Sequence, residues 1–286
     1  MTLGVFDPAT ATGARPRRRI SLGLWLSSSV IAATVAAAIL APVIAPFDPL
    51  AVNLGLINAP PGTDGHLLGT DASGRDILSR LLFGARTSLL GPLIVVIVAT
   101  VLGVAIGALA AWRGGWLDAA LSRVTDFLLA FPGLLAAVFA VALFGPGLVA
   151  PAIGIAIAYT PVIARLTRTV VLQERSKLYV RADLALGFSS TRTLAFGVAP
   201  NALPVVASQS ILSFGYALVD LAALSFLGLG VQPPTPDWGV MLNESRSSIL
   251  QGAWWVLVFP AAAIVLVVVA FNVAGENLVR RRGGGS

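Results

Sequence analysis

The sequence predicts an all-α integral membrane protein with six transmembrane helices. Of its 286 residues, 57% are hydrophobic and only 11% are charged, whereas roughly a quarter of the residues in a soluble domain carry a charge. The hydrophobic residues gather in six runs, each long enough to cross a hydrocarbon core of about 30 Å. The basic residues are concentrated in alternate segments between these runs.

Each apolar run is interpreted as a helix, because a chain in lipid has no water to satisfy its backbone polar groups. A polar tail, residues 1–19, precedes the first run. A cleaved secretory signal is the alternative for this run, but the run is longer than a signal core and further runs follow, which favours an uncleaved anchor. The expected spans cover residues 20–46, 89–112, 125–144, 148–171, 203–229 and 253–273.

The segments between the spans complete the domain organisation. Residues 47–86 form a polar extracytoplasmic segment, and residues 87–280 form the main transmembrane core, which contains a polar loop at 173–201. A proline-rich loop, 230–252, joins the last two spans. Residues 281–286 are a tail whose glycine-rich end resembles an artificial linker.

The distribution of basic residues sets the expected orientation. With the N-terminus inside, fifteen of the nineteen basic residues lie on the cytoplasmic side, and four, Arg75, Arg80, Arg86 and Arg246, lie outside. Cytoplasmic loops are enriched in Lys and Arg. Both termini and the loop 173–201 are therefore predicted to be cytoplasmic. This distribution also argues against a nucleic-acid partner, despite the net charge of +6.

Several kinds of chemistry are missing from the sequence. The absence of cysteine excludes disulfides and thiolate chemistry, and the single histidine, His66, excludes a histidine-cluster metal site. No Gly-x-x-x-x-Gly-Lys-Ser/Thr phosphate loop is present. We therefore expect no catalytic site, cofactor or metal, and we interpret His66 as an ordinary loop histidine.

Two acidic residues lie near or within the expected spans. Asp126 is expected at a helix start, where a carboxylate is favoured by the positive end of the helix dipole. Asp220 lies well inside the fifth span, where an acid is costly and often functional. Two interpretations stay open for it: a packing role, or a place with Ser225 along a translocation path. A membrane-embedded enzyme would have only Asp126 and Asp220 as its acidic pair.

The loop 173–201 contains signals for a structured element. Residues 178–186 are expected to form a short helix that ends at Gly187, because glycine tolerates the left-handed conformation of a helix end. Ser189 or Ser190 can then cap a second short helix. A helix–Gly–Ser–helix element between two spans is more structured than a tether, and we interpret it as a docking surface.

Four stretches resemble a known family. They are HLLGTDASGRDILSRLLFGARTSL at 66–89, DFLLAFP at 126–132, LSFLGLGVQPPTPDWG at 224–239 and AFNVAG at 270–275. Together with six spans and one structured loop, they resemble the inner-membrane permeases of binding-protein-dependent ABC importers, in the dipeptide/oligopeptide/nickel branch. The similarity covers residues 66–280 and fits the second, C-type permease of the pair. It implies the type I ABC importer permease fold, similar to MetI.

The loop 173–201 then resembles the EAA loop, which in this family docks on the ATPase subunit. The positions that keep the family pattern are Tyr179, Ala182, Ala185, Leu186, Gly187, Pro200 and Asn201. Arg181 stands in place of the glutamate that names the loop, and Asp183 in place of an alanine. Leu184 replaces the usual arginine, and Gly197 a common histidine.

The resemblance implies a permease in the bacterial inner membrane that imports peptides or similar small solutes. Its partners would be a homologous second permease, two cytoplasmic ATPases and an extracytoplasmic substrate-binding protein. The outer loops, 47–86 and 230–252, would either receive the binding protein or only cap the helices. Arg181 would pair with an acidic ATPase surface or mark a weakened coupling site. A self-sufficient secondary transporter or channel is the alternative function.

Overall fold

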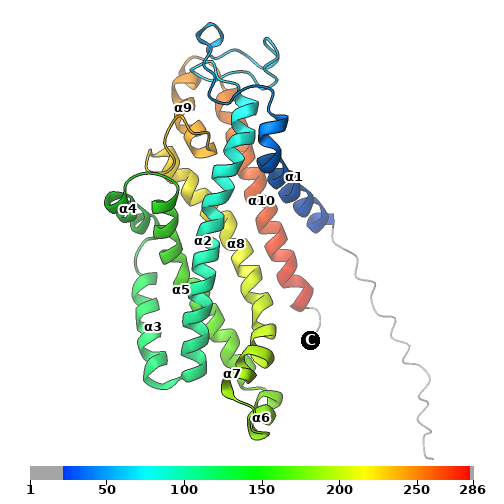
Figure 1. Ribbon diagram of the computed structural model, residues 1–286, viewed down its shortest axis with the longest axis vertical. Coiled ribbons are helices and arrows are strands. Elements are labelled where there is room, and N and C mark those ends of the chain that lie inside the picture. The colour runs from blue at the N-terminus through cyan, green and yellow to red at the C-terminus, as the bar shows by residue number, and fades with distance from the viewer. Residues whose placement is uncertain (1–21, 284–286) are drawn as a thin grey trace, which may run out of the picture.

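A computed structural model describes residues 22–283 of the chain; the expected tail, residues 1–19, and the last three residues of the expected linker lie outside this range. The regular elements of the described residues are all helical (Figure 1). They are α1 Leu22–Ile44, η1 Leu54–Leu56, α2 Ile77–Arg113, α3 Gly115–Leu129, α4 Gly133–Phe144, α5 Val149–Arg175, α6 Leu178–Ala185, α7 Ser190–Arg192, η2 Thr193–Val198, α8 Ala199–Phe226, α9 Trp238–Leu250 and α10 Trp255–Gly283. The predicted all-α class is confirmed.

Five helices, α1, α2, α5, α8 and α10, are long and apolar enough to cross a membrane. The remaining expected span, 125–144, is not one continuous helix. Helices α3 and α4 meet the same criterion only as a pair, and they are bent by 85°. Pro132 explains the break, because proline has no N–H to donate and disfavours a helical conformation at the preceding residue. The expected loop after α2 is also shorter than predicted, since α3 already begins at Gly115.

Two polar segments contain more helix than expected. Helix α2 begins at Ile77 rather than near residue 89, because the Asp76 carboxylate accepts a hydrogen bond from the Ser79 backbone N–H at 2.7 Å and caps the helix. The proline-rich loop 230–252 contains α9, whose N-terminus is capped by Asp237. The segments 47–86 and 230–252 therefore both contain helical structure.

The packing of α2 against α5 is the most extensive helix contact of the described chain. It depends on glycine: a Cβ atom added to Gly107 would lie 2.3 Å from the Ala164 carbonyl oxygen, and one added to Gly103 would lie 2.8 Å from the Ile163 Cβ. Small residues allow backbones in a membrane to approach closely. The Gly103/Gly107 pair thus marks a contact within the chain.

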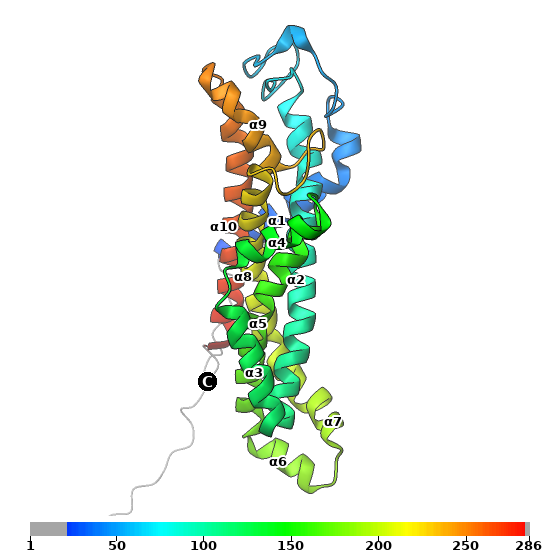
Figure 2. The same cartoon turned by 90° about the vertical axis from the view of Figure 1, so that its left-hand side faces the viewer.

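The helices form an elongated bundle with two different ends (Figures 1 and 2). The short helices α6 and α7 lie at one end, and the chain around residues 45–76 lies with α9 at the other. Buried apolar residues from α2, α5, α8 and α10 fill the space between the ends. The bundle therefore separates residues 178–201, called the inner element after the predicted orientation, from residues 45–76 and α9, called the outer region, by the full length of its helices.

We predict that Gly107→Ala destabilises the protein by about 1–3 kcal/mol, because the added methyl group overlaps the α5 backbone. Thermal unfolding of the purified protein in detergent measures the effect. Gly23→Ala is the matched control, since its Cβ would lie 3.5 Å from Val273, at ordinary contact distance. Equal unfolding temperatures for the two variants would contradict the role of Gly107.

Candidate functional site

The inner element of the chain, residues 178–201, has the predicted helix–Gly–Ser–helix form. Helix α6 ends at Ala185, Gly187 follows with a φ of 85°, and the Ser189 side chain accepts a hydrogen bond from the Arg192 backbone N–H. On the inward side, Val180 is fully buried and packs into an apolar cluster with residues of α2, α5 and α8. The element is a docked part of the fold.

Polar contacts join this element to both neighbouring long helices. The Tyr179 hydroxyl donates to Glu174 Oε2 at 2.7 Å, and Asn201 Nδ2 donates to Tyr179 Oη at 3.0 Å. Asn201 also donates to the Gly197 carbonyl at 3.0 Å, and Lys177 pairs with Glu174 at 2.5 Å. Burial, assisted by the bond to Glu174, raises the pKa of the Tyr179 hydroxyl. The structure thus brings Tyr179 and Asn201 together, two of the predicted site residues.

The outward side of the element exposes apolar side chains and one unpaired charge. Leu178, Leu186 and Phe196 are 82%, 77% and 79% exposed. Arg181 is exposed, and its guanidinium has no acidic partner among residues 22–283. These three side chains leave apolar area of this element uncovered by the described part of the chain. The other predicted residues of α6 and its turn, Ala182, Ala185 and Gly187, are also exposed.

The two remaining predicted residues are Asp183, which lies in α6, and Pro200, which lies in α8. Asp183 is half-buried and lines a shallow hollow with Phe188, Arg192 and Phe196. Pro200 lies in the first turn of α8, directly after a π-helical segment, η2. Such segments are rare and occur at functional sites. Sequence reasoning missed this π-helix; Gly197 and Pro200, which both weaken a regular helix, were the available signal.

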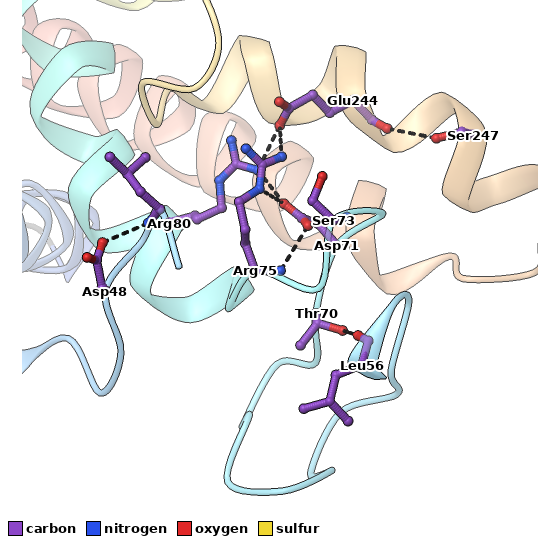
Figure 3. A network of polar contacts seen from close by, with 10 residues as sticks. Asp48, Leu56, Thr70, Asp71, Ser73, Arg75, Arg80, Glu244 and Ser247 are labelled. Carbon is purple, nitrogen blue, oxygen red and sulfur yellow. Dashed lines mark hydrogen bonds and ion pairs between the residues drawn. The ribbon is translucent and has the colours of Figure 1, made fainter. Parts of the chain in front are cut away.

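A buried ionic network lies at the outer end of the bundle (Figure 3). Arg75 Nε lies 2.8 Å from Asp71 Oδ2, and its Nη2 lies 3.0 Å from Glu244 Oε2. Arg80 Nη1 pairs with the same two acids, at 2.7 Å from Glu244. The Arg80 side chain is only 1% exposed. Two guanidinium groups and two carboxylates therefore balance one another and join the outer segment to α9.

His66 is part of the same outer structure and is not an ordinary loop histidine. The residue is buried, its Nδ1 lies 2.9 Å from Asp76 Oδ1, and its ring stacks on Phe47 at 4.3 Å. Asp76 in turn caps α2. His66 therefore helps to hold the outer segment against the start of α2, a contact between distant residues that the sequence pattern did not contain.

The expected position of Asp126 at a helix start is wrong. Asp126 lies in the last turn of α3, where the helix dipole is unfavourable to a carboxylate. It forms an ion pair with Arg165 of α5 at 2.5 Å, and Asp118 pairs with Arg168 of α5 at 2.6 Å. The pair with Arg165 therefore accompanies the unfavourable position of Asp126, whereas Asp118 lies in the first turn of α3, where the dipole also favours a carboxylate.

Asp220 and Ser225 have different surroundings within α8. Asp220 is half-buried, and one of its carboxylate oxygens accepts a hydrogen bond from the Tyr159 hydroxyl of α5 at 2.8 Å. Ser225 is buried and contacts the backbone beside Gly230 and Gly239. The structure does not bring the two residues together as neighbours. The described part of the chain holds no group of three His, Cys, Asp or Glu side chains suited to a metal ion.

Comparison with known proteins gives a consistent result. A family model described as "binding-protein-dependent transport system inner membrane component" matches residues 103–283. The di/tripeptide transport system permease protein DppC of Pseudomonas aeruginosa is 43% identical over 84% of this chain and 81% of its own. The dipeptide permease DppC of Escherichia coli K12 is 44% identical over 84% and 82%. The glutathione permease GsiD of Pectobacterium atrosepticum is 39% identical over 74% and 70%.

Among solved structures, an inward-facing MetNI methionine ABC transporter matches with a TM-score of 0.58. The match covers 71% of this chain and 95% of that chain at 19% identity. At this identity the likeness shows the fold alone. It confirms the expected type I ABC importer permease fold.

We predict that Asp71→Asn destabilises the protein by about 3–5 kcal/mol, because it leaves two buried guanidinium groups with one carboxylate. Thermal unfolding in detergent measures this loss. Asp64→Asn is the matched control, since Asp64 is exposed and has a φ of 46°, a conformation that asparagine tolerates. A destabilisation by Asp71→Asn as small as that by the control would show that the network contributes little.

Proposed function

The chain belongs to the family of binding-protein-dependent transport system inner membrane components, and from this premise we propose that it is a permease subunit of an ATP-driven importer of peptides or similar small solutes. The observation that carries the proposal is the 43–44% identity to dipeptide permeases over 84% of the chain. The fold shared with the methionine transporter supports it independently. The chain itself would have no catalytic role.

The proposed complex contains a homologous second permease, two cytoplasmic ATPases and an extracytoplasmic binding protein. The lack of a phosphate loop supports the need for separate ATPases. The chain would cross the bacterial cytoplasmic membrane several times with both termini in the cytoplasm, as the distribution of basic residues favours. In this orientation the inner element faces the ATPases, and the outer region faces the binding protein.

The inner element, residues 178–201, is the proposed point of energy coupling. Its exposed apolar side chains supply a surface on which an ATPase can dock. Its Tyr179–Glu174 and Tyr179–Asn201 bonds join it to α5 and α8. Movement of a docked ATPase would therefore displace both helices together. Such a displacement can bias the bundle between inward- and outward-facing packings.

The outer region is the proposed receiver of the binding protein. The ionic network joins the segment 71–80 to α9, so that the two outer connections move as one body. A rigid surface loses less conformational entropy when a partner binds. The competing interpretation, that these loops only cap the helices, predicts that the binding protein attaches elsewhere.

Arg181 adds a charge to the proposed docking surface. It has no acidic partner within the described chain, so an acidic group of the ATPase is the partner we propose. Complementary charges across an interface favour the correct partner. The competing interpretation is a weakened coupling site; the intact contacts of Tyr179 and Asn201 argue against it.

Reconstitution into liposomes tests the function. We expect ATP-dependent uptake of dipeptides only when the second permease, the ATPases and the binding protein are all present. A secondary transporter or channel would move the solute without ATPases. A membrane enzyme would convert its substrate, and replacement of both Asp126 and Asp220 by Asn would abolish this activity. Uptake by the isolated chain would contradict the proposal.

We predict that Arg181→Glu lowers the amount of ATPase that copurifies with the permease, and ATP-dependent uptake with it, by at least about tenfold, because like charges would meet across the interface. Arg113→Glu is the matched control, an equal charge reversal at an exposed residue outside the inner element. Unchanged assembly and uptake for Arg181→Glu would disprove the charge pairing.

A further inference from the structure

Helix α8 carries a line of polar side chains along one face of a largely apolar span. The residues are Gln209, Ser213, Tyr216 and Asp220. Their spacing of four, three and four residues places them within about 60° of one another around a helix with 3.6 residues per turn. Polar residues in a span are costly. Because all four lie on one face, we infer that this face contacts polar groups rather than lipid.

This face of α8 is buried at Ser213 and contacts α5 through Asp220, but it is more open around Tyr216. Ser210, on the next face, is bonded to Thr100 of α2 at 2.8 Å, and Gly215 packs against Asn272 of α10. By contrast, Tyr216 is 59% exposed, and Asp220 is only half-buried. The polar face is thus open along its upper part, and a molecule beside the bundle can reach it.

Asp220 has unused capacity to accept hydrogen bonds. Tyr159 donates one bond to Oδ2, and among the described side chains, those of residues 23–278, no basic group pairs with the carboxylate. A carboxylate can accept about four hydrogen bonds. Tyr159 approaches from α5, while Tyr216 lies one turn before Asp220 on the same face of α8. One acid and two tyrosines therefore lie close together where α5 meets α8, and the acid can accept further hydrogen bonds.

From this arrangement, and resting on the function proposed above, we propose that Asp220, Tyr159 and Tyr216 form a transient binding site, along the transport path, for the ammonium group of the imported solute. The carboxylate supplies the opposite charge, and the two rings attract a cation through their faces. A single acid holds an ammonium group weakly enough to release it, as transport requires. The α-ammonium group of a peptide is the chemical group that this site would recognise.

The alternative occupant is a basic side chain of the second permease. Such a side chain would neutralise Asp220 permanently and hold the two permeases together. The two occupants differ in their consequences, because loss of a subunit contact reduces the amount of assembled complex, whereas loss of a solute contact leaves assembly intact.

The test uses the complete complex in proteoliposomes and the dipeptide alanyl-alanine as the solute. Asp220→Asn keeps the size of the side chain and its ability to accept the Tyr159 bond but removes the charge. We expect initial uptake to fall at least tenfold, with normal assembly. Asp220→Glu restores the charge and should recover most of the lost uptake. Tyr159→Phe leaves the carboxylate in place and should lower uptake less than Asp220→Asn does. Ser210→Ala, on the other face of α8, is the control and should leave uptake unchanged.

Three results would overturn the site. Near-normal uptake by Asp220→Asn would show that the charge is not used. An equal loss in Tyr159→Phe would show that the hydrogen bond, and so the packing, is what matters. Reduced copurification of the second permease with Asp220→Asn would assign the carboxylate to a subunit contact. If instead the wild-type complex imports no alanyl-alanine with ATP, the proposed peptide import fails and the site with it.

Discussion

The close contact between α2 and α5 is the constraint on which the rest of the structure depends. In lipid, apolar side chains gain little by association, so helices hold together through close packing. Gly107 brings the α2 backbone against the Ala164 carbonyl region of α5. On the α4 side of α5, a Cβ atom added to Gly154 would lie 2.6 Å from Ala137 Cα. The bundle is thus organised around α5, which carries the inner element at its far end.

Charged side chains are buried and paired at one end of the bundle and exposed at the other. At the outer end, Asp71, Arg75, Arg80 and Glu244 are drawn together and largely hidden from solvent. At the inner end, Arg181 and three large apolar side chains stand exposed. Removing one member of a buried ionic network leaves an unpaired charge and is destabilising, so the outer end is suited to be a rigid surface for the proposed binding protein. The exposed positive charge of Arg181 is instead suited to a partner protein that supplies an acidic group.

Features that depend on local sequence could be predicted. The apolar runs predicted the long helices, and Gly187 with Ser189 predicted the turn of the inner element. Features that depend on distant partners could not be predicted. Asp126 pairs with Arg165, thirty-nine residues away, and Arg75 reaches Glu244. Pro132 could have indicated the 85° bend between α3 and α4. Because Pro132 lies inside a continuous apolar run, that run was interpreted as one straight helix.

The α6–α7 end of the bundle is the proposed docking surface for an ATPase. Because the chain contains no cysteine, a single cysteine at Leu186 can carry a cross-linker without background. Leu67, 64% exposed at the opposite end, provides the matching position. We predict that the Leu186→Cys variant of the assembled complex cross-links to the ATPase, whereas the Leu67→Cys variant does not. Cross-linking of the ATPase from position 67, or none from 186, would contradict it.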